Sequence, residues 1–375
     1  MCSAQAVDTS RALWDIKYAK PEALDGIETA TLNNVEINEN VIKALEDSIN
    51  TGVYENIHSI LILRHNKLVY ERYFQGTDVI RGRGFIGFVE HHRDSLHDIR
   101  SVNKSVVGAA VMIAIGQGKI QHIHNRVFDY FPEYAKYDTG MKRDITIQHL
   151  LNMSAGFEWD EDISYSDTLN SERRMNHSQD AIDFVLSRKM VNMPGTTFKY
   201  NGGCTQLLAA IIERTTGMQV DSFTNEYLFK PLGITQYTWV VIKDGKPSAA
   251  SGLRMRSIDL AKFGLLFLND GIWNNNQIIP SQLVAQTLRS QISTPYTDST
   301  YRTGYSNQFW LPTEIIEGKE VSWVQCQGNG GQIVVIDKQF DLVLVITAGN
   351  YDRSDLKKSS WDIYFDFVYP AIVNK

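Results

Sequence analysis

Ser101 and Lys104 are the residues whose types and spacing most directly suggest chemistry in this 375-residue chain. They stand three positions apart at the head of an apolar segment, so on a helix they face the same side. A serine hydroxyl is a weak nucleophile until a neighbouring base takes its proton, and a lysine whose pKa is lowered by burial can be that base. The alternative is that Ser101 only caps the helix and Lys104 lies at the surface, and Ser-x-x-Lys alone does not separate the two.

Tyr200 is the third candidate, because it precedes a second apolar segment that has the pattern of a buried helix. A phenol held near Ser101 and Lys104 can relay protons between a nucleophile and a leaving group. Two neighbouring cationic or hydrogen-bonding groups would then lower its pKa from the usual value of about 10. The alternative is a packing tyrosine, since the chain has 17 tyrosines.

A glycine-rich stretch lies between two strand-like segments near the end of the chain, over residues 327–332. Its glycines let a substrate approach the backbone closely. A backbone N–H in this stretch can help to hold an oxyanion.

His91, His92 and His97 crowd one segment and raise the question of a metal site. A zinc site would need three or four ligands, with a carboxylate or cysteine at suitable spacing, and the spacing of these histidines matches no familiar zinc-ligand pattern. We therefore interpret them as solvated loop histidines and predict no metal.

The periodicity of apolar residues predicts the elements that must position these groups. Helices are expected over 35–52, 105–118, 147–151, 178–188, 205–215, 257–270 and 356–373. Strands are expected over 58–64, 68–74, 307–311, 321–326, 332–337 and 342–348, the first two forming a hairpin. Residues 76–95 are expected to be an irregular loop that can roof a cleft.

Composition excludes several classes of protein. A net charge of -6 without a run of Lys and Arg argues against nucleic acid as a partner, and no apolar stretch is long enough to span a membrane. Cys2, Cys204 and Cys326 are too few for a disulfide framework. No phosphate-binding or nicotinamide-binding motif is present, so no cofactor is expected.

The N-terminal decapeptide lacks the basic head and apolar core of a signal peptide. Two interpretations of Cys2 stay open. It is either the lipid-carrying first residue of a mature, periplasmic or envelope lipoprotein, or a plain cysteine of a cytoplasmic protein. Localisation is therefore left unknown.

Taken in order, five segments make the chain resemble the superfamily of serine β-lactamases and penicillin-binding proteins, and within it the class C-like group of CubicO-type hydrolases, esterases and 6-aminohexanoate-dimer hydrolase. These segments are HDIRSVNKS, ITIQHLLNMSAGF, PGTTFKYNGGCTQLLAAIIERTTG, GLRMRSIDLAKFG and GNGGQIVVID. The resemblance covers about residues 55 to 370.

The resemblance implies a role for each matching position. Ser101 would be the acylated nucleophile, Lys104 its activating partner, and Tyr200, the first residue of the family's Tyr-x-Asn element, the proton relay. The backbone N–H groups of Ser101 and Asn329 would form the oxyanion hole. Substrate-binding positions would be Asn201, Gly202, Cys326 and Gly328.

Two departures from the family pattern bear on the substrate. Gly202 replaces the asparagine of Tyr-x-Asn, and Cys326 stands where carboxylate-binding relatives have a lysine or histidine. A neutral thiol cannot hold a substrate carboxylate. An ester, amide or peptide without that carboxylate is therefore favoured, unless Arg254 or Arg256 substitutes. The alternatives are a β-lactamase or D-alanyl-D-alanine peptidase, and a weakly catalytic sensor of the cell envelope.

The fold that the resemblance implies is of the α+β class: an antiparallel sheet flanked by helices, with an inserted, mostly helical domain. We expect an N-terminal extension over 1–34, a sheet domain over 35–118 and 250–375, and a helical domain over 119–249. The active site would lie at the junction of the two domains. The oligomeric state is not predicted.

Overall fold

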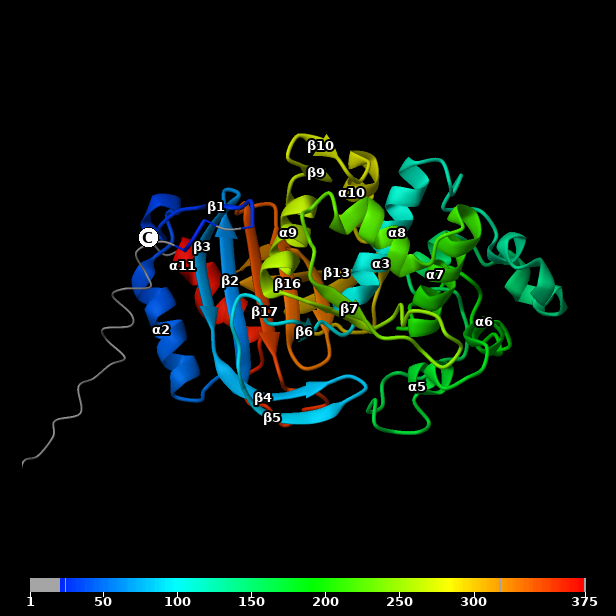
Figure 1. Ribbon diagram of the computed structural model, residues 1–375, viewed down its shortest axis with the longest axis horizontal. Coiled ribbons are helices and arrows are strands. Elements are labelled where there is room, and N and C mark those ends of the chain that lie inside the picture. Colours follow the sequence, from blue (N-terminus) through cyan, green and yellow to red (C-terminus); the bar gives the residue numbers. More distant parts are fainter. Residues whose placement is uncertain (1–20, 24, 317, 374–375) are drawn as a thin grey trace, which may run out of the picture.

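The computed structural model describes residues 21–23, 25–316 and 318–373 (Figure 1). The alternatives for Cys2 concern a residue outside this range. Among the described residues, no helix is both long enough and apolar enough to cross a membrane.

A large sheet organises the molecule, with strand order β1-β3-β2-β17-β16-β15-β13-β12-β11 and β14 paired to β13 (Figure 1). All its pairs are antiparallel except β1 with β3. Its strands are β1 (Glu28–Thr29), β2 (Ile57–Arg64), β3 (Lys67–Tyr73), β11 (Ile292–Ser293), β12 (Tyr301–Ser306), β13 (Phe309–Ile316), β14 (Lys319–Ser322), β15 (Val324–Gly328), β16 (Gln332–Asp337) and β17 (Leu342–Ala348).

Helices cover both faces of this sheet, so its central strands are buried on both sides. In β2, Ile60 and Ile62 join one apolar core while Leu61 and Leu63 join the other, as the two-residue period of a strand requires. One face is covered by α2 (Glu39–Asn50), η6 (Tyr364–Val368) and α11 (Tyr369–Val373), and the other by α3 (Val102–Gly116) and α9 (Ser257–Leu268).

Helix α3 lies at the centre of the molecule, between the sheet and the helical region (Figure 1). Thirteen of its fifteen residues are buried. It packs closely because Gly108 leaves room for the carbonyl of Asn307, which would lie 2.6 Å from an added Cβ. The first turn of α3 is therefore buried in the interior of the molecule.

The region between α3 and α9 is mostly helical. Thr146 caps α4 in a capping box with His149. The helices are η2 (Val127–Tyr130), η3 (Pro132–Tyr137), η4 (Gly140–Asp144), α4 (Ile147–Leu151), α5 (Ser171–Asn176), α6 (Ala181–Leu186), α7 (Gly202–Thr216), α8 (Val220–Thr224) and η5 (Asn225–Phe229).

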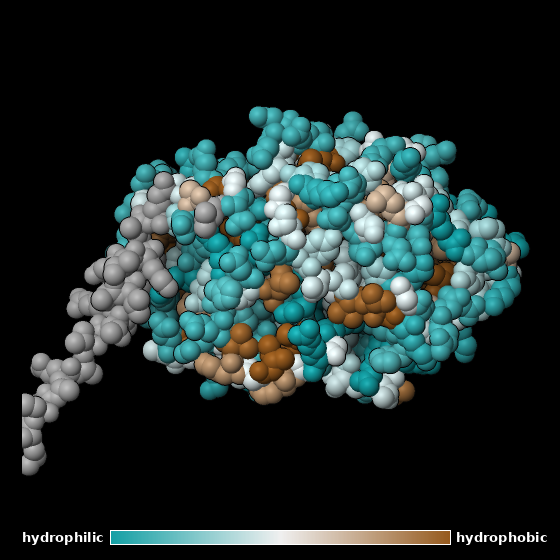
Figure 2. Space-filling view, viewed as in Figure 1, coloured by the Kyte–Doolittle hydropathy of each residue, from teal (hydrophilic) through white to brown (hydrophobic). Residues whose placement is uncertain are grey.

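Smaller elements complete the fold. They are η1 (Asn33–Val35), the hairpin β4 (Gln75–Ile80) and β5 (Gly84–Glu90), the three-stranded sheet β6 (His97–Asp98), β8 (Leu253–Met255) and β7 (Tyr237–Trp239), the pair β9 (Ile272–Trp273) and β10 (Asn276–Gln277), and α10 (Ser281–Thr287). Figure 2 shows an apolar patch at the edge of the molecule where Figure 1 draws β4 and β5.

The α+β fold class is confirmed, and four local predictions are wrong. The strand predicted over 321–326 is divided between β14, which ends at Ser322, and β15, which begins at Val324. Residues 76–95 are not an irregular loop, because most of them form the β4–β5 hairpin. The strand predicted over 307–311 begins later, since Asn307 and Gln308 have φ of 48° and 72° and form the turn before β13. The closing helix is confined to Tyr364–Val373.

Candidate active site

The structure brings Ser101 and Lys104 together at the start of α3. The Lys104 ammonium donates a hydrogen bond to the Ser101 hydroxyl over 3.1 Å. Ser101 is 8% exposed and Lys104 is 1% exposed, so the alternative of a surface lysine is excluded. The residue before Ser101, Arg100, has a left-handed φ of 50°, which turns the chain from β6 into the helix.

Lys104 has more partners than the sequence indicated. Its Nζ lies 3.2 Å from the Ala250 carbonyl, 3.5 Å from Glu172 Oε2 and 3.7 Å from Glu161 Oε1. Burial alone lowers the pKa of Lys104, but Tyr200, Glu172 and Glu161 together raise it above its usual value. The prediction that burial supplies a neutral amine is therefore wrong, and Lys104 is an ammonium at neutral pH.

Tyr200 lies beside this pair, as predicted. The Lys104 ammonium sits 4.6 Å from the centre of its ring, and the other face stacks on Trp310 with ring centres 5.5 Å apart. Burial raises the pKa of the Tyr200 phenol, while Lys104 and a hydrogen bond with Ser101 lower it, and the net shift is upward. The expected fall in its pKa is therefore wrong, and Tyr200 is a neutral phenol.

Glu161 is a buried carboxylate that the sequence analysis missed. The Tyr165 hydroxyl donates to it over 3.0 Å, and the Trp159 indole and the Gly202 N–H also donate to it. Burial raises the pKa of Glu161, Lys104 lowers it and the second carboxylate raises it again, to about 7 in total. Burial therefore makes Glu161 harder to ionise than an exposed carboxyl group.

Glu172 is the second missed carboxylate, and it is fully buried on α5. Arg81, from the turn after β4, approaches it to 3.3 Å, and the Ser251 hydroxyl donates to the same oxygen. Burial alone raises the pKa of Glu172, but Lys104, Arg81 and the Ser251 hydrogen bond lower it to about 2. It is therefore a permanent negative charge beside Lys104.

The departure at Gly202 has a structural reason. A Cβ at this position would lie 2.9 Å from Glu172 Oε2 and 3.1 Å from Glu161 Oε2, so the two carboxylates occupy the space of a side chain. Asn201 is 2% exposed, and its amide oxygen accepts from the Cys204 N–H to cap α7. Neither residue lines the cleft among the described residues, so a direct role in binding substrate is not supported.

Gly328 and Asn329 approach Ser101 from the end of β15. A Cβ on Gly328 would lie 2.5 Å from the Ile99 carbonyl and 3.0 Å from the Ser101 nitrogen. The Asn329 side chain is tied to Asp352 by two hydrogen bonds. Among the hydrogen bonds of the described residues outside helices and strands, none runs from the backbone N–H of Ser101 or of Asn329 to a backbone carbonyl. An oxyanion hole requires two N–H groups without such an acceptor.

Cys326 does not face the cleft. Its side chain is 0% exposed beneath α3, where burial, partly opposed by a hydrogen bond with Ser105, raises the pKa of the thiol to about 12. The expectation that this position contacts substrate is therefore wrong. Its neighbour Gln327 lines the cleft instead.

A cleft of about 670 Å³ opens over Ser101, and its lining combines polar residues with six aromatic side chains. These are Tyr165, Tyr200, Tyr296, Tyr301, Trp310 and Trp361. The cation lining it in the described residues is Arg353, which is paired with Asp355.

Arg254 and Arg256, the suggested substitutes for a carboxylate-binding cation, do not line this cleft. Arg254 pairs with Asp98 at 2.7 Å, and Arg256 pairs with Asp259 at 2.7 Å. Both guanidinium groups therefore serve the structure around β6 and α9.

The prediction of solvated loop histidines is wrong for two of the three. His91 and His97 are only 7% and 2% exposed, and they lie against His58 of β2. His92 is exposed, as expected.

Comparison with known proteins places these features in a family. The family described as Beta-lactamase matches residues 50–360. A 6-aminohexanoate-dimer hydrolase of Paenarthrobacter ureafaciens is 25% identical over 290 residues, which cover 72% of this chain and 70% of that protein.

Two solved structures illustrate the similarity of fold. The octameric penicillin-binding protein homologue from Pyrococcus abyssi superposes with a TM-score of 0.67 at 16% identity, covering 90% of this chain and 77% of the other. A family VIII carboxylesterase gives 0.66 at 17% identity, covering 88% and 96%.

Proposed function

Because the chain belongs to the Beta-lactamase family and is a hydrolase of its serine type, we propose that it cleaves an ester or amide bond through an acyl-enzyme on Ser101. The observation that carries this proposal is the 3.1 Å contact between Lys104 Nζ and Ser101 Oγ at the floor of the cleft. A nucleophile and its partner within hydrogen-bond distance are the signature of covalent catalysis.

In the proposed reaction, Ser101 Oγ forms a bond to the substrate carbonyl carbon, and its proton passes to the Tyr200 oxygen as the neutral phenol passes its own proton toward the leaving oxygen or nitrogen. The Lys104 ammonium stabilises the charge that develops between the two oxygens. The tetrahedral intermediate then breaks its bond to the leaving oxygen or nitrogen, which takes the proton from Tyr200. Water repeats the sequence on the acyl-enzyme and releases the acid.

Glu161 and Glu172 support this chemistry by fixing the charge of Lys104. Both carboxylates lie within 3.7 Å of its Nζ, and their negative charge raises its pKa. Lys104 then acts as a fixed cation rather than as the first proton acceptor. The Ser101 and Asn329 N–H groups are the proposed oxyanion hole.

The cleft favours a substrate that lacks a carboxylate at the reacting end. Its lining includes aromatic side chains and the carboxylates of Asp162 and Asp352, and its described cation Arg353 is already paired with Asp355. The name of the Paenarthrobacter relative specifies hydrolysis of 6-aminohexanoate dimer, so linear amides are candidates beside simple esters. A β-lactamase, a D-alanyl-D-alanine peptidase and a sensor are the alternatives.

A hydrolysis panel tests the proposal. We expect measurable kcat/KM for p-nitrophenyl esters or linear amides, values at least tenfold lower for nitrocefin and D-alanyl-D-alanine peptides, and no turnover by Ser101→Ala. A nitrocefin kcat/KM of about 10⁶ M⁻¹s⁻¹ or more, with esters poorer, would make the protein a β-lactamase. Binding of these compounds without any turnover would favour the sensor.

A further inference from the structure

Three buried side chains from separate strands converge behind the nucleophile. They are His58 of β2, Asp78 of β4 and His97 of β6, which are 0%, 2% and 2% exposed. One ligand-type atom from each lies within 4.8 Å of the other two. None of the three lines the cleft over Ser101.

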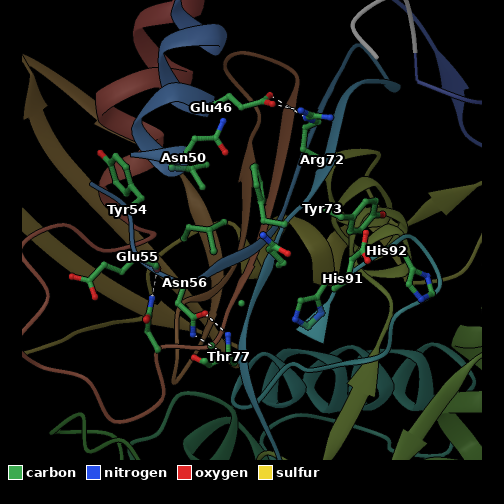
Figure 3. A pocket seen from close by; sticks show the side chains of 18 of the residues that line it. Glu46, Asn50, Tyr54, Glu55, Asn56, Arg72, Tyr73, Thr77, His91 and His92 are labelled. Atoms are coloured by element: carbon green, nitrogen blue, oxygen red, sulfur yellow. Dashed lines mark hydrogen bonds and ion pairs between the residues drawn. The ribbon is translucent and has the colours of Figure 1, made fainter. Parts of the chain in front are cut away.

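The hydrogen bonds of Asn56 fix the tautomer of His58. The Asn56 amide nitrogen donates to the Thr77 carbonyl over 2.9 Å, and its oxygen accepts from the Thr77 N–H over 2.8 Å (Figure 3). His58 Nε2 lies 3.2 Å from that same oxygen, so Nε2 carries the hydrogen. The lone pair of neutral His58 is therefore on Nδ1.

His97 is fixed in the complementary way. Its Nδ1 lies 3.1 Å from the Asp98 carbonyl and donates to it, which leaves the lone pair on Nε2. His58 Nδ1 and His97 Nε2 are 2.8 Å apart, so two lone pairs face each other. Only a shared proton or a metal ion satisfies both.

A shared proton is the less favourable of these two. Both rings are buried, and burial disfavours the charged imidazolium that a shared proton would create. The neutral imidazole is the form that binds metals.

Asp78 adds a buried negative charge to this arrangement. One of its oxygens accepts from the Tyr351 hydroxyl over 3.2 Å and from the Val79 N–H over 2.8 Å. Among the described residues, no lysine or arginine forms an ion pair with Asp78. The arginines Arg100 and Arg254 pair with Asp98 instead. A buried carboxylate without a cation is costly, and a metal ion removes that cost.

The backbone is shaped closely around His58. A Cβ on Gly76 would lie 2.7 Å from His58 Nε2, and a Cβ on Gly349 would lie 2.6 Å from His58 Cε1. His91 stacks on the ring at a centre distance of 4.0 Å, and its buried Nε2 has no hydrogen-bond partner in the described chain. His91 also lines the pocket of Figure 3, which gives an ion a path from solvent.

From these contacts we infer that His58, Asp78 and His97 bind a divalent transition-metal ion of the zinc type, with His91 or a water in the fourth position. Two imidazoles and one carboxylate are a common ligand set for zinc, and each imidazole already donates its other N–H to a carbonyl oxygen. Because His97 lies four residues before Ser101, the ion would tie β2 and the β4–β5 hairpin to the nucleophile turn.

Metal binding by the full-length chain tests this inference without any assay of hydrolysis. Protein freed of metal with a chelator is titrated with Co²⁺, whose absorption reports tetrahedral imidazole ligation, and then with competing Zn²⁺. We expect one ion per chain, and at least tenfold weaker binding in His97→Gln and Asp78→Asn. His92→Ala, which removes an exposed histidine of the same segment, is the matched control and should bind as the unaltered chain does.

Two results would overturn the inference. One is the absence of stoichiometric Co²⁺ or Zn²⁺ binding by the unaltered chain at about 100 µM metal. The other is binding by folded His97→Gln that equals the unaltered chain. If His97→Gln fails to fold, Asp78→Asn and the spectrum of the unaltered chain decide the question. Normal metal binding in Ser101→Ala would show that this site and the hydrolytic site are separate.

Discussion

At the scale of single residues, the charge of Lys104 bears on the proposed activation of Ser101. A neutral lysine would take the serine proton directly, but two carboxylates within 3.7 Å favour the ammonium form of Lys104. In the proposed mechanism Tyr200, a neutral phenol, accepts the Ser101 proton only as it passes its own proton to the leaving group. The proposal therefore treats Lys104 and Tyr200 as one unit.

A double-mutant cycle tests that unit. Lys104→Met and Tyr200→Phe should each lower kcat by about 10²–10⁴-fold, because Tyr200 relays the proton and Lys104 stabilises the charge that develops during its transfer. The double variant should lose much less than the product of the two single losses. Steady-state kinetics on the best ester of the panel is the measurement.

Tyr296→Phe is the control for this cycle, since Tyr296 lines the same cleft without contacting Lys104 in the described structure. It should change kcat by less than tenfold. Multiplicative losses in the double variant would mean that one of the two residues has only a structural role.

Glu161 makes a separate prediction about stability and pH. Its pKa rises from 4.5 to about 7 in the folded chain, so the folded state keeps a proton that the unfolded state releases. Stability from this group is therefore lost as pH rises from about 4.5 to about 7, by on the order of 3 kcal/mol at most. The side chain of Glu161→Gln cannot titrate. The unfolding free energy of this variant, measured with urea, should therefore rise relative to that of the unaltered chain across that pH interval.

Glu158→Gln, an exposed neighbour, should show no such gain. If the stability difference between the unaltered chain and Glu161→Gln stayed constant from pH 4.5 to 8, the Glu161 carboxyl would have an ordinary pKa.

At the scale of elements, β15 contributes a core residue at its middle and contacts the Ser101 turn at its end. Gly328 brings the strand against the Ser101 turn, where a Cβ would collide with the Ile99 carbonyl. Cys326, two residues earlier, points the same way along the pleat but lies fully beneath α3. The lack of a cation at this position is therefore a property of the core rather than of the cleft.

Cys326→Lys tests this assignment. We expect a loss of about 3–5 kcal/mol in unfolding free energy, because an ammonium would be buried without a partner. Recognition of carboxylate-bearing esters should not improve. Cys326→Ser, which keeps the size of the side chain, should lose clearly less stability in the same urea experiment. A stable Cys326→Lys with a lower KM for such esters would mean that the position faces the cleft.

Elements with a strong apolar period could be predicted from the sequence. Strands β16 and β17 match their predicted bounds, and α4 begins after the expected Thr146 cap. The β4–β5 hairpin could not be predicted, because glycines with positive φ at its turn and within β5 break the alternation of apolar and polar residues.

The residues of the candidate site also divide into those that could be proposed from the sequence and those that could not. Ser101, Lys104 and Tyr200 could be proposed from their spacing and from the family resemblance. Glu161 and Glu172 could not, because they stand in polar segments that look solvated. Only long-range packing against α3 and α7 buries them.

At the scale of the whole molecule, the cleft exists because one apolar core joins the sheet to the helical region. That core includes residues of α3, α7 and α9, so the two parts are held around α3 (Figure 1). The proposed nucleophile comes from the start of α3, the phenol from the segment before α7, and the proposed oxyanion donor from the end of β15. The site therefore depends on the complete fold.

Covalent labelling tests the central claim most directly. A fluorophosphonate probe should add to the intact chain once, and peptide mapping should place the adduct on Ser101. Ser101→Ala should take no label while remaining folded, and Ser164→Ala, which removes another hydroxyl of the cleft, should label normally. An adduct on a different residue, or persistent labelling of folded Ser101→Ala, would contradict the assignment of Ser101 as the nucleophile.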